Sequence, residues 1–338
     1  MTEPVADLVR KWDLASPATP YDDQFNQVHE RILFLRGTHY YQYIPTIGSR
    51  FPDYETRLDQ WIANVTDERD KQLLFRFAPR ILFFGRDEFA KLYEMALRGP
   101  ITHWLVDLLG LRLDDAQLSS KLSAELSEHT WFCPITDSLH ISEFCHANRI
   151  GGFDKRPDWQ SLAVFGDRAK IKDYMARPPG LRPGPLTRLV LLEDYVGSGT
   201  QMENALRFAA ELDGSLPVLF VPLIISPAGA QCARLLCTQY ANLRFDPVME
   251  LQAKDALNGD THADPGSLEA NMIELASRTY SSVVGNDAAH PRPYTCFGFL
   301  ETGATIVLYS NTPANTLPII QHQSNSWMAL FPRSARIQ

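Results

Sequence analysis

Residues 190–201 read VLLEDYVGSGTQ, and the interpretation of the whole chain starts from them. An apolar run typical of a buried β-strand ends in two consecutive acids, Glu193 and Asp194. A glycine-rich turn follows, and the next residues, QMENALRFAAEL, have the apolar spacing of an amphipathic helix. A strand, a turn and a helix in this order are typical of a βα unit in a parallel sheet.

The turn itself is suited to a sugar phosphate. Gly197 and Gly199 let backbone N–H groups approach a phosphate without obstruction by Cβ, and the amino end of the following helix favours an anion. The hydroxyls of Ser198 and Thr200 can donate hydrogen bonds to phosphate oxygens. Carboxylates at the carboxyl end of a strand can accept hydrogen bonds from vicinal ribose hydroxyls. The sequence therefore predicts a site for a ribose 5-phosphate.

This stretch resembles the signature of the type I phosphoribosyltransferases, which consists of a hydrophobic strand, two acids, two apolar residues and a loop rich in Gly, Ser and Thr. Glu193 and Asp194 match the acid pair, Tyr195 and Val196 match the apolar pair, and residues 197–201 match the loop. Many family members close the loop with Thr or Ser, where this chain has Gln201, so an amide replaces one hydroxyl donor. The resemblance implies that the acid pair forms the catalytic centre and that the loop binds phosphate through Gly197, Ser198, Gly199, Thr200 and Gln201.

Two other interpretations of the loop remain open. One is a plain connection between a strand and a helix. The other is an amino-methyltransferase, whose cofactor loop can also read acid, aromatic, GSGT. Such enzymes need a Pro-Pro-aromatic motif after a later strand, whereas Pro178-Pro179 is followed by Gly180 and precedes the loop.

An earlier segment, residues 133–144 (CPITDSLHISEF), lies where the phosphoribosyltransferases bind the pyrophosphate of their donor. Thr136, Asp137 and Ser138 provide short polar groups between a predicted strand and a predicted helix. They are candidate ligand-binding residues, although Asp137 or Ser138 could equally be a plain helix N-cap. An acid facing a pyrophosphate needs a counter-charge, so we expect Mg²⁺, bound through the ligand and with Asp137 as the candidate protein ligand.

Residues 149–188 are rich in basic residues within a chain of formal net charge −8. In the resembling family a flap at this place closes over the reacting sugar and excludes water. Candidates for binding the departing pyrophosphate are Lys155, Arg156, Arg168, Lys170 and Lys172. The alternative is an ordinary solvated face.

The C-terminal segments SNTPANTLPI and WMALFPR, taken with the loop, resemble a narrower group, the phosphoribosyltransferase-like effectors of bacterial conflict systems, including retron-associated ones. This resemblance implies that Asn311, Thr312 and Asn315 line the site, whereas the alternative is an Asn/Pro turn that closes the last strand. It also implies an antiphage effector that takes phosphoribosyl pyrophosphate or a nucleotide-like ligand. A reverse transcriptase with its RNA–DNA product would then be the restraining partner. The open alternatives are a housekeeping nucleobase phosphoribosyltransferase and a catalytically silent sugar-phosphate sensor.

The pattern along the chain predicts an α/β fold with a helical N-terminal region over residues 1–128. A phosphoribosyltransferase-like parallel sheet with helices on both faces and a C-terminal hood follows over residues 129–338. Residues 304–311, ATIVLYSN, read as its last strand. Before it, Asp87 is a predicted N-cap, and Gly99-Pro100 is predicted to stop the helix that follows Asp87.

The bulk composition excludes several classes of protein. The formal net charge of −8 argues against a protein that coats nucleic acid without sequence preference. The five cysteines have neither zinc-finger spacing nor a CxxC pair, which suits reduced thiols in a cytosol. The chain has no signal-like apolar core near its start and no apolar run long enough for a membrane span, so we expect a cytoplasmic protein.

Overall fold

The computed structural model describes residues 3–15, 24–45, 52–151, 168–176, 184–285 and 293–334. The chain forms two compact units: a discontinuous unit from Met1–Arg86 with Ala253–Gln338, and a sheet unit from Asp87–Gln252. The sequence-based boundary after residue 128 falls inside the sheet unit instead. The difference has a physical cause, because helices that precede residue 128 cover the sheet and the C-terminal segment packs with the N-terminal helices.

The sheet unit is built on a five-stranded parallel sheet. Four strands lie side by side in chain order, and a fifth pairs with the end of β4. They are β2 (Thr130–Pro134), β3 (Arg188–Val196), β4 (Val218–Ile225), β5 (Leu243–Phe245) and β6 (Met249–Glu250). Every residue of β2, β3 and β4 is buried, as expected of a parallel sheet that is covered on both faces.

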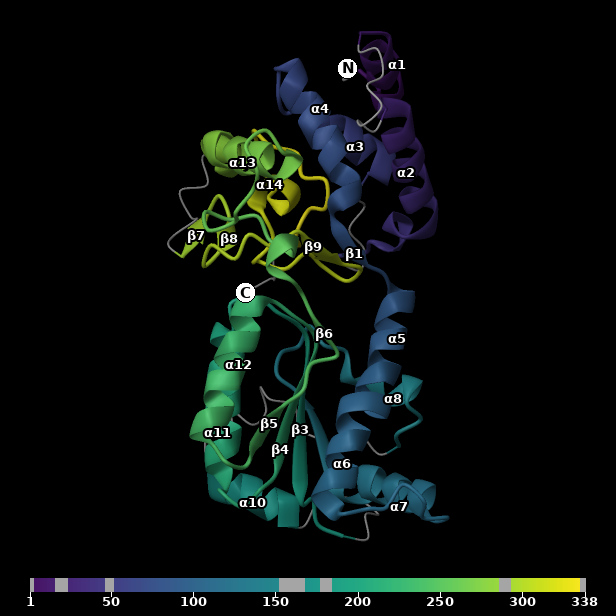
Figure 1. Ribbon diagram of the computed structural model, residues 1–338, viewed down its shortest axis with the longest axis vertical. Helices are drawn as coiled ribbons and strands as arrows, with labels where there is room; N and C mark the ends of the chain where they lie inside the picture. Colours follow the sequence, from purple (N-terminus) through teal and green to yellow (C-terminus); the bar gives the residue numbers. More distant parts are fainter. Residues whose placement is uncertain are drawn as a thin grey trace. The chain divides into compact units, whose positions relative to one another are not determined.

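Helices cover both faces of this sheet (Figure 1). Because side chains alternate along a strand, Trp131 and Cys133 join the core formed with α11 and α12, while Phe132 contacts Phe144 of α8 on the other face at a ring distance of 5.4 Å. The helices are α5 (Arg86–Ala96), α6 (Thr102–Leu109), α7 (Leu118–Ala124), α8 (Ile141–Ala147), α10 (Arg168–Ala176), α11 (Thr200–Leu212) and α12 (Pro227–Gln239). The predicted α/β fold class is confirmed.

The predicted helix stop at Gly99-Pro100 is wrong. The chain continues from α5 through a π-helical turn, Leu97–Ile101, which contains Pro100, and runs directly into α6. A π turn adds a residue to the helical repeat, so a proline without an N–H is accommodated instead of ending the helix. The helix ends at Gly110, which has the left-handed conformation typical of a C-cap (φ 58°). Asp87 lies in the first turn of α5, which begins two residues earlier than the predicted N-cap implies.

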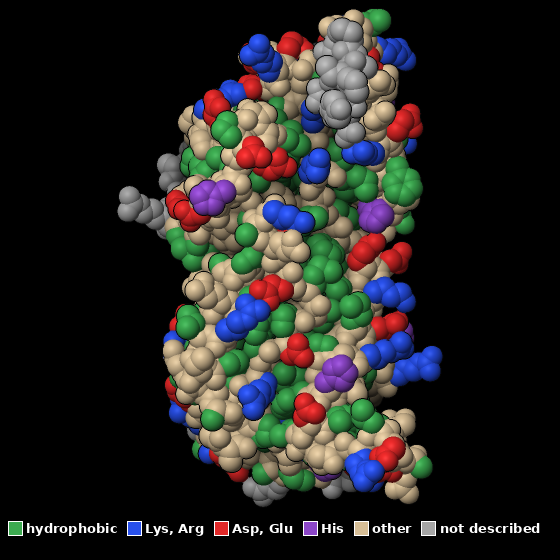
Figure 2. Space-filling model, viewed as in Figure 1, with side chains coloured by type: hydrophobic (Ala, Val, Ile, Leu, Met, Phe, Trp, Pro, Cys, Tyr) green, Lys and Arg blue, Asp and Glu red, His purple; other side chains and the backbone are tan. Residues whose placement is uncertain are grey.

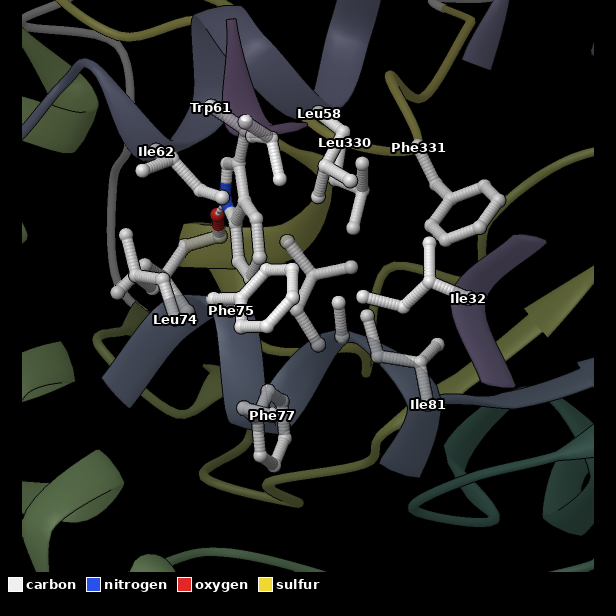
Figure 3. Close-up of a cluster of buried hydrophobic side chains, with 14 of the residues drawn as sticks. Ile32, Leu58, Trp61, Ile62, Leu74, Phe75, Phe77, Ile81, Leu330 and Phe331 are labelled. Atoms are coloured by element: carbon white, nitrogen blue, oxygen red, sulfur yellow. Dashed lines mark hydrogen bonds between the residues drawn. The ribbon is translucent and has the colours of Figure 1, made fainter. Parts of the chain in front are cut away.

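The discontinuous unit combines the N-terminal helices with the C-terminal segment. Its helices are α1 (Val5–Ala15), α2 (Phe25–Thr38), α3 (Tyr54–Ile62), α4 (Glu68–Phe77), α13 (Leu268–Val284) and α14 (Pro318–Gln321), and its strands are β1 (Leu82–Phe84), β7 (Tyr294–Thr295), β8 (Gly298–Phe299) and β9 (Ile306–Leu308). Leu330 and Phe331, close to the C-terminus, lie among buried side chains of α2, α3 and α4 (Figure 3). The tail is therefore part of a hydrophobic core.

The predicted last strand does form, as β9, but not in the main sheet. It pairs in parallel with β1, a short strand that the sequence reading did not identify, with Ile306 beside Leu82. Local periodicity shows that a segment is extended and buried, whereas the choice of a partner depends on contacts between distant parts of the chain.

On the face shown in Figure 2, acidic and basic side chains are interspersed, without a large area of one sign. In the described part of the chain, no helix combines the length and the apolar character that a membrane crossing requires.

Candidate active site

The two predicted ligand loops meet at one edge of the sheet. β2 and β3 are adjacent parallel strands in which Pro134 is level with Leu192, and the N–H of Ile135 donates to the carbonyl of Leu192 at 2.9 Å. The segment after β2 therefore lies beside the acid pair at the end of β3. This is the carboxyl edge of the strands, where open α/β sheets bind ligands.

Hydrogen bonds join the two loops directly. The N–H of Thr136 donates to Glu193 Oε2 at 3.0 Å, and the Thr136 hydroxyl donates to Glu193 Oε1 at 2.6 Å. The Ser138 hydroxyl donates to Asp194 Oδ1 at 3.0 Å, and the two hydroxyls lie 2.6 Å apart. The structure thus brings together Thr136, Ser138, Glu193 and Asp194, four residues that the sequence predicts for one site.

The acid pair is buried without a basic side chain among its hydrogen-bond partners in the described residues. Glu193 and Asp194 are each only 5% exposed. Burial raises the pKa of Glu193 well above its ordinary value, and the neighbouring Asp194 raises it further, against the hydrogen bonds from Thr136. Burial also raises the pKa of Asp194, against the hydrogen bonds from the Tyr195 N–H and the Ser138 hydroxyl and against the nearby His140. The buried pair therefore holds protons more tightly than exposed carboxyls do.

The glycine-rich loop has the conformation that an anion-binding turn needs. Gly199 is the N-cap of α11 and has φ 85°, a left-handed conformation that favours glycine. A glycine has no side chain to cap the helix, so no side-chain hydrogen bond satisfies the first N–H groups of α11. The hydroxyls of Ser198 and Thr200 lie 3.1 Å apart at this helix start. The Gln201 side chain is exposed on the first turn.

The loop is supported from behind by the start of α12. The Ser226 hydroxyl donates to the carbonyl of Gly197 at 2.6 Å, and Gly229 packs so closely that an added Cβ would lie 2.9 Å from the same carbonyl. The sequence reading did not identify these two supporting residues. A signal for Ser226 was present, because a serine before Pro227 is a typical N-cap, but its bond to the loop depends on tertiary contacts.

Two further residues at this edge of the sheet, Tyr195 and His140, were not predicted to have a polar or catalytic role in the site. The sequence reading treats Tyr195 as apolar, yet its hydroxyl is buried and has no hydrogen-bond partner among the described residues. Burial raises the pKa of Tyr195, so the hydroxyl stays protonated. His140, for which no catalytic role was predicted, is close enough to lower the pKa of Asp194 against the larger effect of burial.

The predicted flap residues divide into two groups. Lys155 and Arg156 lie outside the described residues. Arg168 and Lys172 of α10 pair instead with the far end of α11, at 2.6 Å to Glu211 and 3.3 Å to Asp213. That end is about 16 Å from the glycine-rich loop, at about 1.5 Å per helical residue. Neither Arg168 nor Lys172 therefore reaches a phosphate at the loop in this structure, and Lys170 lies on the same helix.

The predicted site residues near the C-terminus belong to the discontinuous unit. Asn311 Oδ1 accepts from the N–H groups of Thr312 and Ser334 at 2.9 and 3.1 Å. The Asn315 amide donates to the Phe299 carbonyl and the Thr302 hydroxyl at 3.2 and 2.8 Å. These bonds are the ones expected of residues that hold turns together, which was the alternative interpretation of this segment.

The acid pair and Asp137 provide the carboxylates from which a divalent cation could be held. Among the described residues, no group of three or more His, Cys, Asp or Glu side chains forms a ready-made metal site. Mg²⁺ commonly binds through one or two carboxylates together with substrate phosphates, so such a cluster is not required. Asp137 is exposed beside the pair and raises the pKa of Glu193, although less than burial and Asp194 do. The excess of negative charge fits a cation that arrives with a ligand.

Comparison with known families agrees with this geometry. The family model described as PRTase-CE matches residues 58–333, which include the whole sheet unit and much of the discontinuous unit. Searches of the curated proteins and of the solved structures found no match. The resemblance inferred from the glycine-rich loop and the C-terminal segment is confirmed: the chain belongs to the PRTase-CE family, the phosphoribosyltransferases of conflict and effector systems.

Proposed function

We propose that the protein binds phosphoribosyl pyrophosphate, or a nucleotide-like relative, and acts at the anomeric carbon of its ribose. The observation that carries this proposal is the direct hydrogen bonding between the two loops, from Thr136 to Glu193 and from Ser138 to Asp194. These bonds join the acid pair, which in the proposal binds the ribose, and the turn after β2, which in the proposal receives the pyrophosphate, in one continuous polar site.

Each part of the site has a separate task in this proposal. The uncapped first turn of α11, with the hydroxyls of Ser198 and Thr200, holds the 5-phosphate. Asp194 Oδ2, which makes no hydrogen bond to a described residue, accepts from a ribose hydroxyl while Oδ1 stays bonded to Ser138. Thr136, Asp137 and Ser138 then face the pyrophosphate. The acid pair stabilises the positive charge that develops on the sugar as the bond from the anomeric carbon to pyrophosphate breaks.

Mg²⁺ is the expected cofactor. When bound, it would neutralise charge on the departing pyrophosphate. The residues placed to hold it are Asp137 and the acid pair, together with ligand oxygens. Since the raised pKa values of Glu193 and Asp194 reflect burial without a counter-charge, a cation in the site would lower both pKa values and favour the ionised pair.

Family membership favours an effector role in a conflict system over housekeeping salvage. We further propose that this role is antiphage defence in a retron, with the activity restrained by a reverse transcriptase and its RNA–DNA product. The support is the family to which the chain belongs and the resemblance of its C-terminal segment.

The experiment compares the wild type with Asp194→Asn and with a matched control, Asp114→Asn. Asp194→Asn keeps an acceptor for Ser138 and for the Tyr195 N–H but removes the charge. Asp114 is an exposed acid paired with Arg112. Consumption of phosphoribosyl pyrophosphate or nucleotides, and toxicity on expression, should fall by about 100-fold or more in Asp194→Asn and stay unchanged in the control. Full activity and toxicity in a folded Asp194→Asn protein would contradict the proposal.

A further inference from the structure

A cavity that is separate from the acid-pair site lies within the discontinuous unit. Its volume is about 560 Å³, and it is formed by the end of α2, the segment that follows, and the start of α3. Its walls are mostly aromatic and apolar, and Tyr41 and Ile44 are 65% and 59% exposed there. Half of the lining residues are Tyr40, Tyr41, Tyr43, Ile44, Pro45 and Tyr54.

One arginine in this wall is buried. Arg57 is only 5% exposed. Its guanidinium carbon lies 5.3 Å from the centre of the Tyr43 ring, 5.6 Å from that of Phe331 and 5.9 Å from that of Tyr54. No hydrogen bond or ion pair to the Arg57 guanidinium occurs among the described residues, and its Nε is buried without a partner. An arginine does not lose its charge in a protein, so this cation is stabilised by ring faces and by the nearby charge of Asp53.

A second donor in the same wall is also unsatisfied. The Tyr54 hydroxyl is buried and has no hydrogen-bond partner among the described residues. Burial raises the pKa of Tyr54 well above its ordinary value, so the hydroxyl keeps its proton. Native proteins rarely leave buried donors without acceptors, and those that remain commonly mark a missing water, ion or ligand. Here two such donors line one cavity.

The nearby acids do not provide the missing acceptor. The carboxylate of Asp53 is the N-cap of α3 and accepts from the Thr56 N–H at 3.0 Å and from the Thr56 hydroxyl at 2.8 Å. Glu55 forms an ion pair with Arg36. Residues 46–51, TIGSRF, which lie outside the described residues, contain no acid. Asp53 attracts Arg57 electrostatically, but none of these carboxylates accepts a hydrogen bond from the Arg57 guanidinium.

We infer that this cavity binds a small ligand that carries an oxyanion, a carboxylate or a phosphate, on a flat apolar ring. The oxyanion accepts hydrogen bonds from the Arg57 guanidinium and the Tyr54 hydroxyl, and the ring packs against Ile44, Pro45 and Pro52. A guanidinium matches the planar, two-oxygen edge of such groups. Because Phe331 packs on the same guanidinium, the ligand also tightens the attachment of the C-terminal segment to α3.

The experiment measures binding to the full chain by calorimetric titration and by the shift in melting temperature, with benzoate and phenyl phosphate as probes. Benzamide, which has the same ring but no charge, is the matched neutral probe. A ligand that binds only the folded protein raises its melting temperature. At least one of the two anions should bind and raise the melting temperature, and benzamide should do neither. The two anions distinguish a carboxylate site from a phosphate site.

Variants then place the bound anion in the cavity. Tyr54→Phe removes only the unsatisfied hydroxyl and should weaken binding by about fivefold, the effect of one hydrogen bond. Tyr41→Phe, on an exposed tyrosine of the same wall, is its control and should bind as the wild type does. Arg57→Met should weaken binding by about 20-fold or more, because it removes a charge-assisted donor. Its control is Arg10→Met, on an arginine that is 77% exposed.

Three outcomes would overturn the inference. One is that neither anion binds up to its solubility limit. Another is that benzamide binds as tightly as the anions, which would indicate a plain apolar pocket. The third is that Tyr54→Phe and Arg57→Met bind the anion as the wild type does. If Arg57→Met does not fold, the comparison of Tyr54→Phe with Tyr41→Phe decides, because neither of these changes removes a satisfied hydrogen bond.

Discussion

The two units bury charge in different ways. In the sheet unit, Glu193 and Asp194 are buried carboxyls that accept hydrogen bonds from backbone and hydroxyl donors. In the discontinuous unit, the Arg57 guanidinium is a buried cation that contacts ring faces and makes no hydrogen bond to a described residue. A carboxyl can take up a proton when its counter-charge is absent, whereas a guanidinium cannot release one. The acid pair therefore tolerates an empty site better than Arg57 does.

The difference indicates how each site should respond to a ligand. Filling the acid-pair site with a cation releases protons, because the ionised pair becomes favoured. Filling the Arg57 cavity with an anion adds hydrogen bonds without a change in protonation of the arginine. Proton release on binding, measured by titration in buffers of different ionisation enthalpy, thus separates the two sites.

The largest effect should come from Phe331→Ala, which tests whether ring faces hold the buried cation. Phe331 is fully buried (0% exposed) and packs on Arg57 and four aromatic rings of the core. Its removal should lower the free energy of unfolding by about 4 kcal/mol, measured by denaturant titration. Phe34→Ala, at a position 65% exposed, should change it by less than about 0.5 kcal/mol. Equal effects of the two variants on the free energy of unfolding would contradict the claim that ring faces hold the buried Arg57.

Gly229→Ala should have the next largest effect, and it tests the support of the loop beside the acid pair. The added Cβ would lie 2.8 Å from Val196 Cγ1 and 2.9 Å from the Gly197 carbonyl oxygen. We expect a loss of about 2 kcal/mol in the free energy of unfolding and weaker binding of phosphoribosyl pyrophosphate. Gly214→Ala, where nothing lies within 4 Å, is the matched control and should be neutral. If Gly229→Ala binds phosphoribosyl pyrophosphate with the affinity of the wild type, then α12 does not position the loop.

The pH dependence of stability tests how burial affects the acid pair, Glu193 and Asp194. A carboxyl whose pKa is raised by folding binds more protons in the folded state, so its contribution to stability is lost as pH rises from about 4 through the folded pKa. Each unit of elevation corresponds to about 1.4 kcal/mol. Burial raises the pKa values of Glu193 and Asp194, so the empty wild type should lose stability over this range.

Asp194→Asn removes one of these two groups and its repulsion on the other. At about pH 8 and without ligand, its free energy of unfolding should exceed that of the wild type, and the gap should close toward pH 4. The measurement is a denaturant titration at several pH values, with Asp114→Asn as the control that runs parallel to the wild type. A difference in the free energy of unfolding that stays constant between pH 4 and pH 8 would mean that burial does not raise the pKa values of the pair.

Thr136→Val should have the smallest effect. It removes the hydroxyl that donates to Glu193 Oε1 but keeps the backbone N–H that donates to Oε2. We expect a loss of about 1 kcal/mol in the free energy of unfolding at neutral pH. The decline of stability with pH should also steepen, because this hydrogen bond opposes the elevation of the Glu193 pKa. Thr238→Val, on a hydroxyl that bonds within an exposed helix, is the control. Curves that coincide for both variants would show that the Thr136 bond does not stabilise the ionised Glu193.

Segments with a strong local pattern were predicted from sequence. β3, the glycine-rich turn and α11 follow from an apolar run, glycines and an amphipathic repeat. Residues 268–284, LEANMIELASRTYSSVV, also have a helical apolar spacing and form α13, and Ser267 caps this helix by accepting from Ala270 N–H. Local stereochemistry is sufficient in these cases, because every residue that decides the structure lies within one or two turns of the others.

The sequence by itself determined the α/β fold class, the family and the position of the glycine-rich loop between β3 and α11, because each depends on residues that are neighbours along the chain. Only the tertiary structure decided that β9 pairs with β1, that the C-terminal segment joins the core of the N-terminal helices, and that Ser226 and Gly229 support the loop. It also decided that Arg57 is buried without an acceptor in the described residues. Burial and partner choice come from packing between segments far apart in sequence, and a local pattern does not encode which distant segment covers a side chain.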